Sequence, residues 1–437
     1  MTIKLHRHYP NLFHGEFFSL AMFLMLTLPY FLHTYYDLPI AIGTISMFII
    51  CFIYFFSVFK HTFIKALEKY NIIPGLILFI VIFSHSFFIF FIVGGDLARS
   101  LYSFIIFSIF ILSSYLIVFI FDAINNSKIE RTLNYVFLLL SLIPVFAFFE
   151  FNWTHDNKDI LLFSEPSHFA LIYIPLLFYM LVTVDYKYKL FLIAYTLLFL
   201  SIWPNLTFFI GVCIGLVFLI PIRYFYIAIF FVLMPIGTFL IKFNCSFKAT
   251  CMNYYNYYIE FLPSYYLDRI FLSFDSMNLS SIVFLVGWEK AYLNFKYTYG
   301  WGIGFQQFGV INFEGFLENI YLDRFSLQEP LNKLDGASLA PKLIGELGFI
   351  GLIIVAVFSL FFVSTIRSLS ISSLAKGRKN SKNIFFQSIF AASFLDIFIR
   401  GTGYFNPPIL LLLSASFWLF LSKSIQNHYS LRYKSFW

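Results

Sequence analysis

Apolar runs close to 20 residues long recur along this chain of 437 residues and constrain its fold more than any other feature. A run of that length crosses the hydrocarbon core of a bilayer as an α-helix, which satisfies its own backbone hydrogen bonds. The runs are too long and too continuous to be the alternating strands of a membrane barrel. Charged residues make up only 12% of the chain, against about 25% in soluble proteins. The sequence therefore predicts an all-α polytopic membrane protein.

We expect about twelve membrane-spanning helices, placed by the apolar runs between charged residues and turn residues. The seventh and eighth are short and meet at Trp203-Pro204-Asn205, so a single broken hairpin is the alternative there. The expected spans are 16–33, 38–58, 72–93, 100–121, 134–150, 168–184, 189–203, 206–222, 224–243, 341–364, 384–400 and 408–423.

The spans divide the chain into three parts. Residues 1–243 hold the first nine spans, residues 244–340 form one long loop, and residues 341–437 hold the last three spans and a tail. The loop is the only long segment that is not strongly apolar, yet the apolar run Ile282–Trp288 gives it surface to bury. We expect short helices in it rather than a disordered linker.

The four cysteines do not form a disulfide framework. Cys51 and Cys213 lie within apolar spans, where we expect them to be core residues. Cys245 and Cys251 lie at the start of the long loop, where we predict a disulfide between them, with a pair of free thiols as the alternative.

The basic residues indicate the orientation. Eighteen of the 29 lysines and arginines fall on the side of the two termini, and most of the others lie in the long loop, which the positive-inside rule discounts. The termini are therefore predicted to be cytoplasmic and the long loop to lie outside. The net charge of +7 is scattered through short loops, which argues against a nucleic-acid partner.

A short outer connection, Ser164-Glu165-Pro166-Ser167-His168, precedes the sixth span. The structural interpretation is a helix start, with Pro166 in the first turn and Ser164 as the cap. The functional interpretation is a catalytic pair, because Glu165 and His168 are three residues apart on one helical face at a depth where ionisable groups are costly.

Two glycine-rich segments flank the return of the chain into the membrane. Gly300–Gly309 lacks the spacing and the strand-turn-helix setting of a dinucleotide fingerprint, so we expect a tight turn that approaches a ligand or another helix. In Ser338–Gly351 the glycines suit close helix packing, whereas Glu346, inside the expected span, is a candidate functional residue.

Arginines are rare in the short outer connections, where Arg99 and Arg400 are the two that occur. Such arginines suit an anionic ligand at the membrane surface, because a guanidinium binds phosphate oxygens in pairs. A structural salt bridge is the alternative, and for Arg400 its partner would be Asp396, four residues earlier.

These segments taken in order resemble the O-antigen polymerase family (Wzy-type), within the wider group of O-antigen polymerases and ligases. The residues that carry the resemblance are Glu165-Pro166-Ser167-His168-Phe169-Ala170, Trp288 with Gly300–Gly309, Ser338–Gly351 and Arg400–Pro408. The chain departs from the family pattern in having no arginine within Ser280–Gly287, and Arg269 is the nearest one upstream.

The resemblance implies a bacterial inner-membrane glycosyltransferase with a GT-C-like architecture and a periplasmic active face. It would join oligosaccharide repeat units carried on undecaprenyl diphosphate, without metal or cofactor, alongside a chain-length regulator and the repeat-unit flippase. Glu165 and His168 would be catalytic, and Arg99, Arg269 and Arg400 would bind the diphosphate. The remaining implied substrate contacts are Trp288, Tyr299, Glu346 and Asn406.

Two other classes fit parts of the pattern. An O-antigen ligase shares the architecture and the donor but transfers to lipid A-core, and the Glu165–His168 cluster favours the polymerase. A polysaccharide transporter or flippase would place charges along a central path and show repeated spans, which this sequence does not.

The predicted topology is tested with a reporter fused after residue 310. An alkaline phosphatase fusion, active only outside the cytoplasm, is expected to be active there, and a fluorescent protein that folds only in the cytoplasm is expected to be dark. The opposite pattern would reverse the assigned orientation.

Overall fold

The computed structural model describes residues 13–59, 72–151, 160–203, 205–220, 224–225, 279–313, 315–325, 334–375, 380–401 and 403–434. Its helices are α1 (Phe13–Tyr36), α2 (Ile40–Phe59), α4 (Ile73–Val93), α5 (Leu97–Ala123), α6 (Asn126–Phe151), α7 (Pro166–Thr183), α8 (Tyr186–Ile202), α9 (Leu206–Leu216), the 3-10 turn η1 (Val217–Leu219), α12 (Leu279–Tyr297), α13 (Phe316–Phe325), α14 (Leu339–Leu347), α15 (Phe349–Leu374), α16 (Ser381–Phe398) and α17 (Pro407–Lys434).

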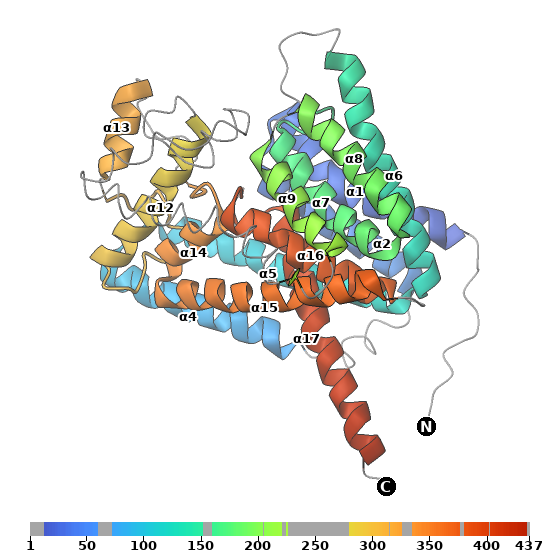
Figure 1. Cartoon of the computed structure of the whole chain (residues 1–437). Helices are drawn as coiled ribbons and strands as arrows, with labels where there is room; N and C mark the ends of the chain where they lie inside the picture. The colour runs from blue at the N-terminus through green and yellow to red at the C-terminus, as the bar shows by residue number, and fades with distance from the viewer. Residues whose placement is uncertain are drawn as a thin grey trace.

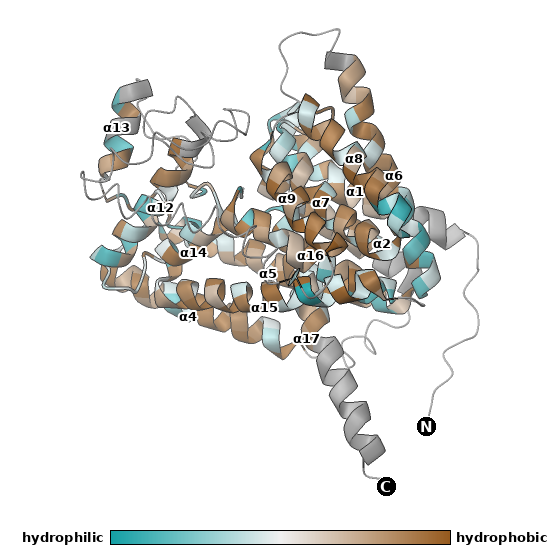
Figure 2. Cartoon of the chain, viewed as in Figure 1, coloured by the Kyte–Doolittle hydropathy of each residue, from teal (hydrophilic) through white to brown (hydrophobic). Residues whose placement is uncertain are grey.

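The described part of the chain is almost entirely helical and contains no strand, as the sequence predicted. Six of its helices, α1, α4, α5, α6, α7 and α15, are long and apolar enough to cross a membrane. Shorter apolar helices lie in α2, in α9 with η1, and in α17. In Figure 2, brown hydrophobic residues predominate along the ribbons of α4, α7 and α15. The chain is therefore a multi-pass membrane protein.

Two groups of helices meet along α16 (Figure 1). One group holds α1, α2 and α6–α9, and the other holds α4, α5, α14 and α15. α16 packs most extensively on α7 and on α17, which leaves the bundle toward the C-terminus. α12 and α13 stand outside these groups and reach them mainly through α14. The core is rich in aromatic rings, such as Phe169 stacked on Tyr173.

The connections between helices gather at two opposite ends of the bundle. At one end, Lys382 Nζ donates to Asp122 O at 2.8 Å, and Lys189 Nζ donates to Ser373 O at 2.9 Å. At the other end, Tyr35 OH donates to Leu161 O at 3.2 Å. The two lysine contacts join connections that the sequence places on the side of the termini. The Tyr35 contact joins connections that the sequence places outside. These contacts agree with the predicted alternation of the spans.

Most expected spans coincide with helices. The first eight match α1 through α9 with η1, and the last two match α16 and α17. α8 and α9 are separate helices on either side of Trp203 and Asn205. The ninth span, 224–243, lies outside the described residues except for its first two. Six helices reach full spanning length and composition in the described part.

The tenth expected span, 341–364, is wrong as a single helix. The chain breaks at Gly348, which has a φ of +57° and separates α14 from α15. A Cβ at Gly348 would collide with the backbone oxygen of Gly300, so the break depends on glycine. α14 is a short amphipathic helix, and the spanning helix α15 begins only at Phe349.

The described portion of the expected long loop contains one short helix, α13, with 10 residues, and a turn at Gly300–Gly309. Its other helix, α12, has 19 residues and is longer than the short helices expected there. Cys51 is buried and Cys213 is half-buried, and both are free. Cys245, Cys251 and Arg269 lie outside the described residues.

Candidate functional site

The N-terminus of α7 positions the cluster that the sequence singled out. Glu165 occupies the cap position in extended conformation, and Pro166 lies in the first turn as expected. The expected cap by Ser164 is wrong. Its hydroxyl lies 3.3 Å from His168 Nδ1, and the helix start receives no side-chain cap bond.

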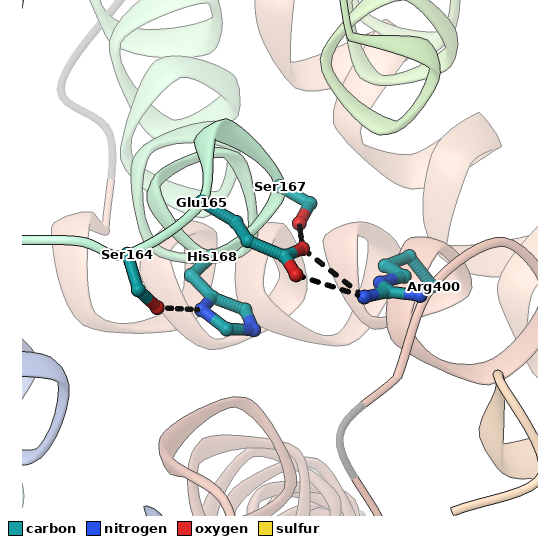
Figure 3. A network of polar contacts seen from close by, with 5 residues as sticks. All are labelled: Ser164, Glu165, Ser167, His168 and Arg400. Atoms are coloured by element: carbon teal, nitrogen blue, oxygen red, sulfur yellow. Dashed lines mark hydrogen bonds and ion pairs between the residues drawn. The ribbon is translucent and has the colours of Figure 1, made fainter. Parts of the chain in front are cut away.

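Arg400 reaches Glu165 from the far end of α16. Its Nη2 lies 3.2 Å from Glu165 Oε1 and 3.1 Å from Oε2, and Ser167 Oγ donates to Oε2 at 2.8 Å (Figure 3). The expected pair with Asp396 is absent among the described contacts of Arg400. α16 ends at Phe398, so Arg400 no longer follows the helical spacing that would bring it over Asp396.

Asp396 is instead fully buried and accepts a hydrogen bond from Asn406 Nδ2 at 3.3 Å. Asn406 also donates to Gly403 O at 3.0 Å and accepts from Ile409 N at 2.8 Å. These bonds fix the connection between α16 and α17. They satisfy the buried amide of Asn406, so its burial needs no bound ligand as an explanation. The substrate role of Asn406 stays a prediction.

His168 is buried on α7 beside residues of α1. Its ring centroid lies 5.2 Å from that of Tyr30 and 6.3 Å from that of His33. Its Nδ1 faces Ser164, which leaves Nε2 without a hydrogen bond to any described residue. No pattern in the sequence indicated Tyr30 and His33, because they lie in another apolar span more than a hundred residues earlier.

The electrostatics of Glu165 differ from what its position at the membrane surface predicted. Burial alone would raise the pKa of Glu165, as we expected for a base. Arg400 and His168, with the Ser167 and Arg400 hydrogen bonds, outweigh burial and lower the pKa below its ordinary value. The carboxylate is therefore ionised, and half-exposed at 45% side-chain accessibility.

Arg99, in the first turn of α5, makes no described contact with this cluster. Its backbone N–H donates to Asp96 Oδ1 at 2.9 Å, and its side chain forms no ion pair with any described residue. Of these four predicted site residues, the structure brings Glu165, His168 and Arg400 into one cluster. Arg99 is not part of it.

The glycine-rich turn at Gly300–Gly309 is held by hydrogen bonds to two helices, the start of α5 and α4. Gln307 Nε2 donates to Asp96 O at 2.9 Å and to Ser100 Oγ at 2.7 Å, and its Oε1 accepts from Asp96 N at 2.8 Å. On α4, Ser86 Oγ accepts from Phe305 N at 3.0 Å. Of the two expectations for this turn, approach to another helix is the one the structure shows.

Glu346 fills the inner side of that turn. Its two carboxylate oxygens accept hydrogen bonds from the backbone N–H groups of Gln306, at 2.8 Å, and Phe308, at 2.9 Å. A ring of backbone N–H groups of this kind is a common anion-binding nest. Here the chain's own carboxylate occupies it. These two bonds explain why Glu346 can be fully buried, and no bound ligand is needed for that explanation. The substrate role of Glu346 stays a prediction.

The glycine-rich turn also supports the connection between α16 and α17, which carries Arg400. Phe305 stacks on Tyr404 with ring centroids 4.9 Å apart. Lys342 Nζ bonds Gln306 Oε1 at 3.3 Å and Leu334 O at 2.6 Å. Gly401 N donates to Ala337 O at 3.0 Å. The residue that follows Arg400 is therefore tied to the segment before α14, a relation that no spacing in the sequence indicates.

Two further predicted contacts lie on or near α12. Trp288 is partly buried and packs between the main core and the small cluster around Val283 and Leu317. Tyr299 follows α12 with a φ of +52° and is 89% exposed. Neither touches Glu165 or Arg400 through a described hydrogen bond, and their substrate roles stay predictions.

Within the described ranges, no group of three His, Cys, Asp or Glu side chains is placed to hold a metal ion. The cluster offers instead a carboxylate, an imidazole and a guanidinium, which suit proton transfer and anion binding. No protein-family model, no curated protein and no solved structure matches this chain.

We expect Glu346→Gln to destabilise the protein. The amide has only one acceptor oxygen, so one buried N–H loses its partner at a cost of about 1–3 kcal/mol. The measurement is thermal unfolding of purified protein in detergent. Asp185→Asn is the matched control, because Asp185 is exposed and its side chain makes no cap bond. Equal unfolding temperatures for both variants would contradict the role of Glu346.

Proposed function

We propose that this protein is a polysaccharide repeat-unit polymerase of the bacterial inner membrane. It joins oligosaccharides carried on undecaprenyl diphosphate at the periplasmic face, as the resemblance to O-antigen polymerases implies. The proposal includes the finer topology, with twelve spans, a GT-C-like architecture and cytoplasmic termini. A chain-length regulator and the repeat-unit flippase are the protein partners that this function implies.

One observation carries the proposal. Arg400 and Glu165, predicted separately as a phosphate ligand and a base, lie in contact at one end of a membrane bundle. His168 completes the cluster from the next turn of α7. Both charged side chains remain partly exposed, at 22% for Arg400 and 45% for Glu165, so a substrate at the bundle end can reach them.

The reaction uses these groups as follows. The oxygen of an acceptor sugar hydroxyl forms a bond to the anomeric carbon of the donor. The bond from that carbon to the phosphate oxygen breaks, and the lipid diphosphate leaves with the electron pair. Glu165 accepts the hydroxyl proton, and His168 orients the acceptor or takes the proton itself. Arg400, with Arg269 and Arg99 as further candidates, stabilises the charge that develops on the leaving group.

The test is polymer length in cells that carry Glu165→Gln, His168→Ala, Arg400→Lys or Arg269→Lys. Each loss of a catalytic contact is expected to cost on the order of 100-fold in rate. Lysine does not replace a paired guanidinium contact. Arg131→Lys is the matched control, because Arg131 is exposed on α6 and is predicted to lie on the cytoplasmic side. Membrane levels of every variant are measured alongside.

A Glu165→Gln or Arg400→Lys protein that is made normally and polymerises at the parental rate would remove that residue from the mechanism. Deletion of the gene separates the alternative functions. Loss of the lipopolysaccharide ladder with a single-repeat band retained indicates a polymerase. Loss of the single-repeat band as well indicates a ligase or a flippase.

A further inference from the structure

We infer that Arg400 is an exchangeable cation: the diphosphate of an incoming lipid-linked donor takes it from Glu165, and the released carboxylate then serves as the base. This inference rests on the proposed function. It makes the ion pair the resting state of the site, and it couples donor binding to base activity.

The geometry of the pair permits the exchange. A single guanidinium nitrogen, Nη2, contacts both carboxylate oxygens of Glu165. The other guanidinium nitrogens of Arg400 form no hydrogen bond with any described residue, so they are donors open to phosphate oxygens. Pairs with this degree of exposure contribute little net stability and exchange partners readily.

The surroundings of Glu165 give the exchange its chemical consequence. Burial favours the neutral carboxyl, whereas Arg400, His168 and the Ser167 hydroxyl favour the carboxylate. A diphosphate bound to Arg400 compensates that positive charge and adds negative charge beside Glu165. Burial then dominates and the pKa of Glu165 rises. A carboxylate with a raised pKa is the better proton acceptor.

Other ionisable groups face the same space. Within the described ranges these are His168 on α7, His33 and Tyr30 on α1, and Asp396 on α16. The experiment therefore compares wild type with Glu165→Gln, which retains all four of these groups and lacks only the carboxyl of residue 165.

The sign of the linkage is set by Glu165. Its pKa is lowered in the free protein and higher once the ligand holds Arg400. At a pH between these two values, the complex holds a proton that the free protein does not. Binding in that window therefore takes up a proton, and affinity increases as the pH falls through it. Above the raised pKa the released carboxylate stays ionised in the complex, and there it serves as the base.

The test uses the full chain in lipid nanodiscs and a diphosphate diester that joins a short isoprenyl chain to a monosaccharide. A diester is chosen because its own charge stays constant over the pH range. Wild type, Glu165→Gln, Arg400→Gln and Arg131→Lys are compared by calorimetry. Wild type is expected to take up a proton on binding, seen as a heat that depends on the ionisation enthalpy of the buffer.

Glu165→Gln is expected to bind the diester about fivefold more tightly than wild type. The reason is that the diester no longer has to break the ion pair of Arg400, which at this exposure contributes little. Its binding is expected to be independent of pH. Arg400→Gln should bind much more weakly, and Arg131→Lys should match wild type. The Glu165→Gln protein is thus the tighter binder while it fails to polymerise.

Equal or weaker binding by Glu165→Gln, or wild-type binding without proton uptake, would overturn the exchange. A pH dependence that persists unchanged in Glu165→Gln does not come from Glu165 and would overturn it as well. Absence of proton uptake by wild type overturns the exchange even where a variant fails to fold. Failure of the proposed function looks different, because wild type and Glu165→Gln would then both leave the diester unbound.

Discussion

The contact between Glu165 and Arg400 joins two segments that lie 235 residues apart in the chain. α7 and α16 pack along much of their length, and this contact closes their common end. A lone charge at the edge of a bilayer is costly, so each of the two side chains requires a partner or water. Their pairing brings the candidate base to the candidate phosphate ligand. The charge distribution of the candidate site follows from this one contact.

A second set of polar contacts keeps Arg400 in place without touching it. Glu346 holds the backbone of Gly300–Gly309, Gln307 fixes that turn to the start of α5, and Phe305 packs on Tyr404. The charged and amide groups in this set are matched with backbone groups, as burial requires. The turn therefore supports the candidate site from behind, and its glycines serve close backbone approach.

The sequence predicted the helices well, because apolar runs and turn residues act locally. It also singled out Glu165, His168 and Arg400 as candidates, since ionisable residues stand out in apolar surroundings. Contacts across the fold could not be predicted. Nothing in the spacing paired Arg400 with Glu165 rather than Asp396, and the low pKa of Glu165 follows from that pairing. Similarly, the break at Gly348 depends on the approach of Gly300, which only the folded chain reveals.

The most direct test of this account is cross-linking between positions 165 and 400. Cysteines replace Glu165 and Arg400 in a chain whose four natural cysteines are serines and which carries a protease site between α9 and α12. After treatment with a short bifunctional thiol reagent and cleavage, the two fragments are predicted to stay joined. Cysteines at Lys189 and Ser373, in contact at the other end of the bundle, are the positive control, and those at 189 and 400 the negative control. Fragments that separate for 165 and 400 while the positive control stays joined would contradict the account.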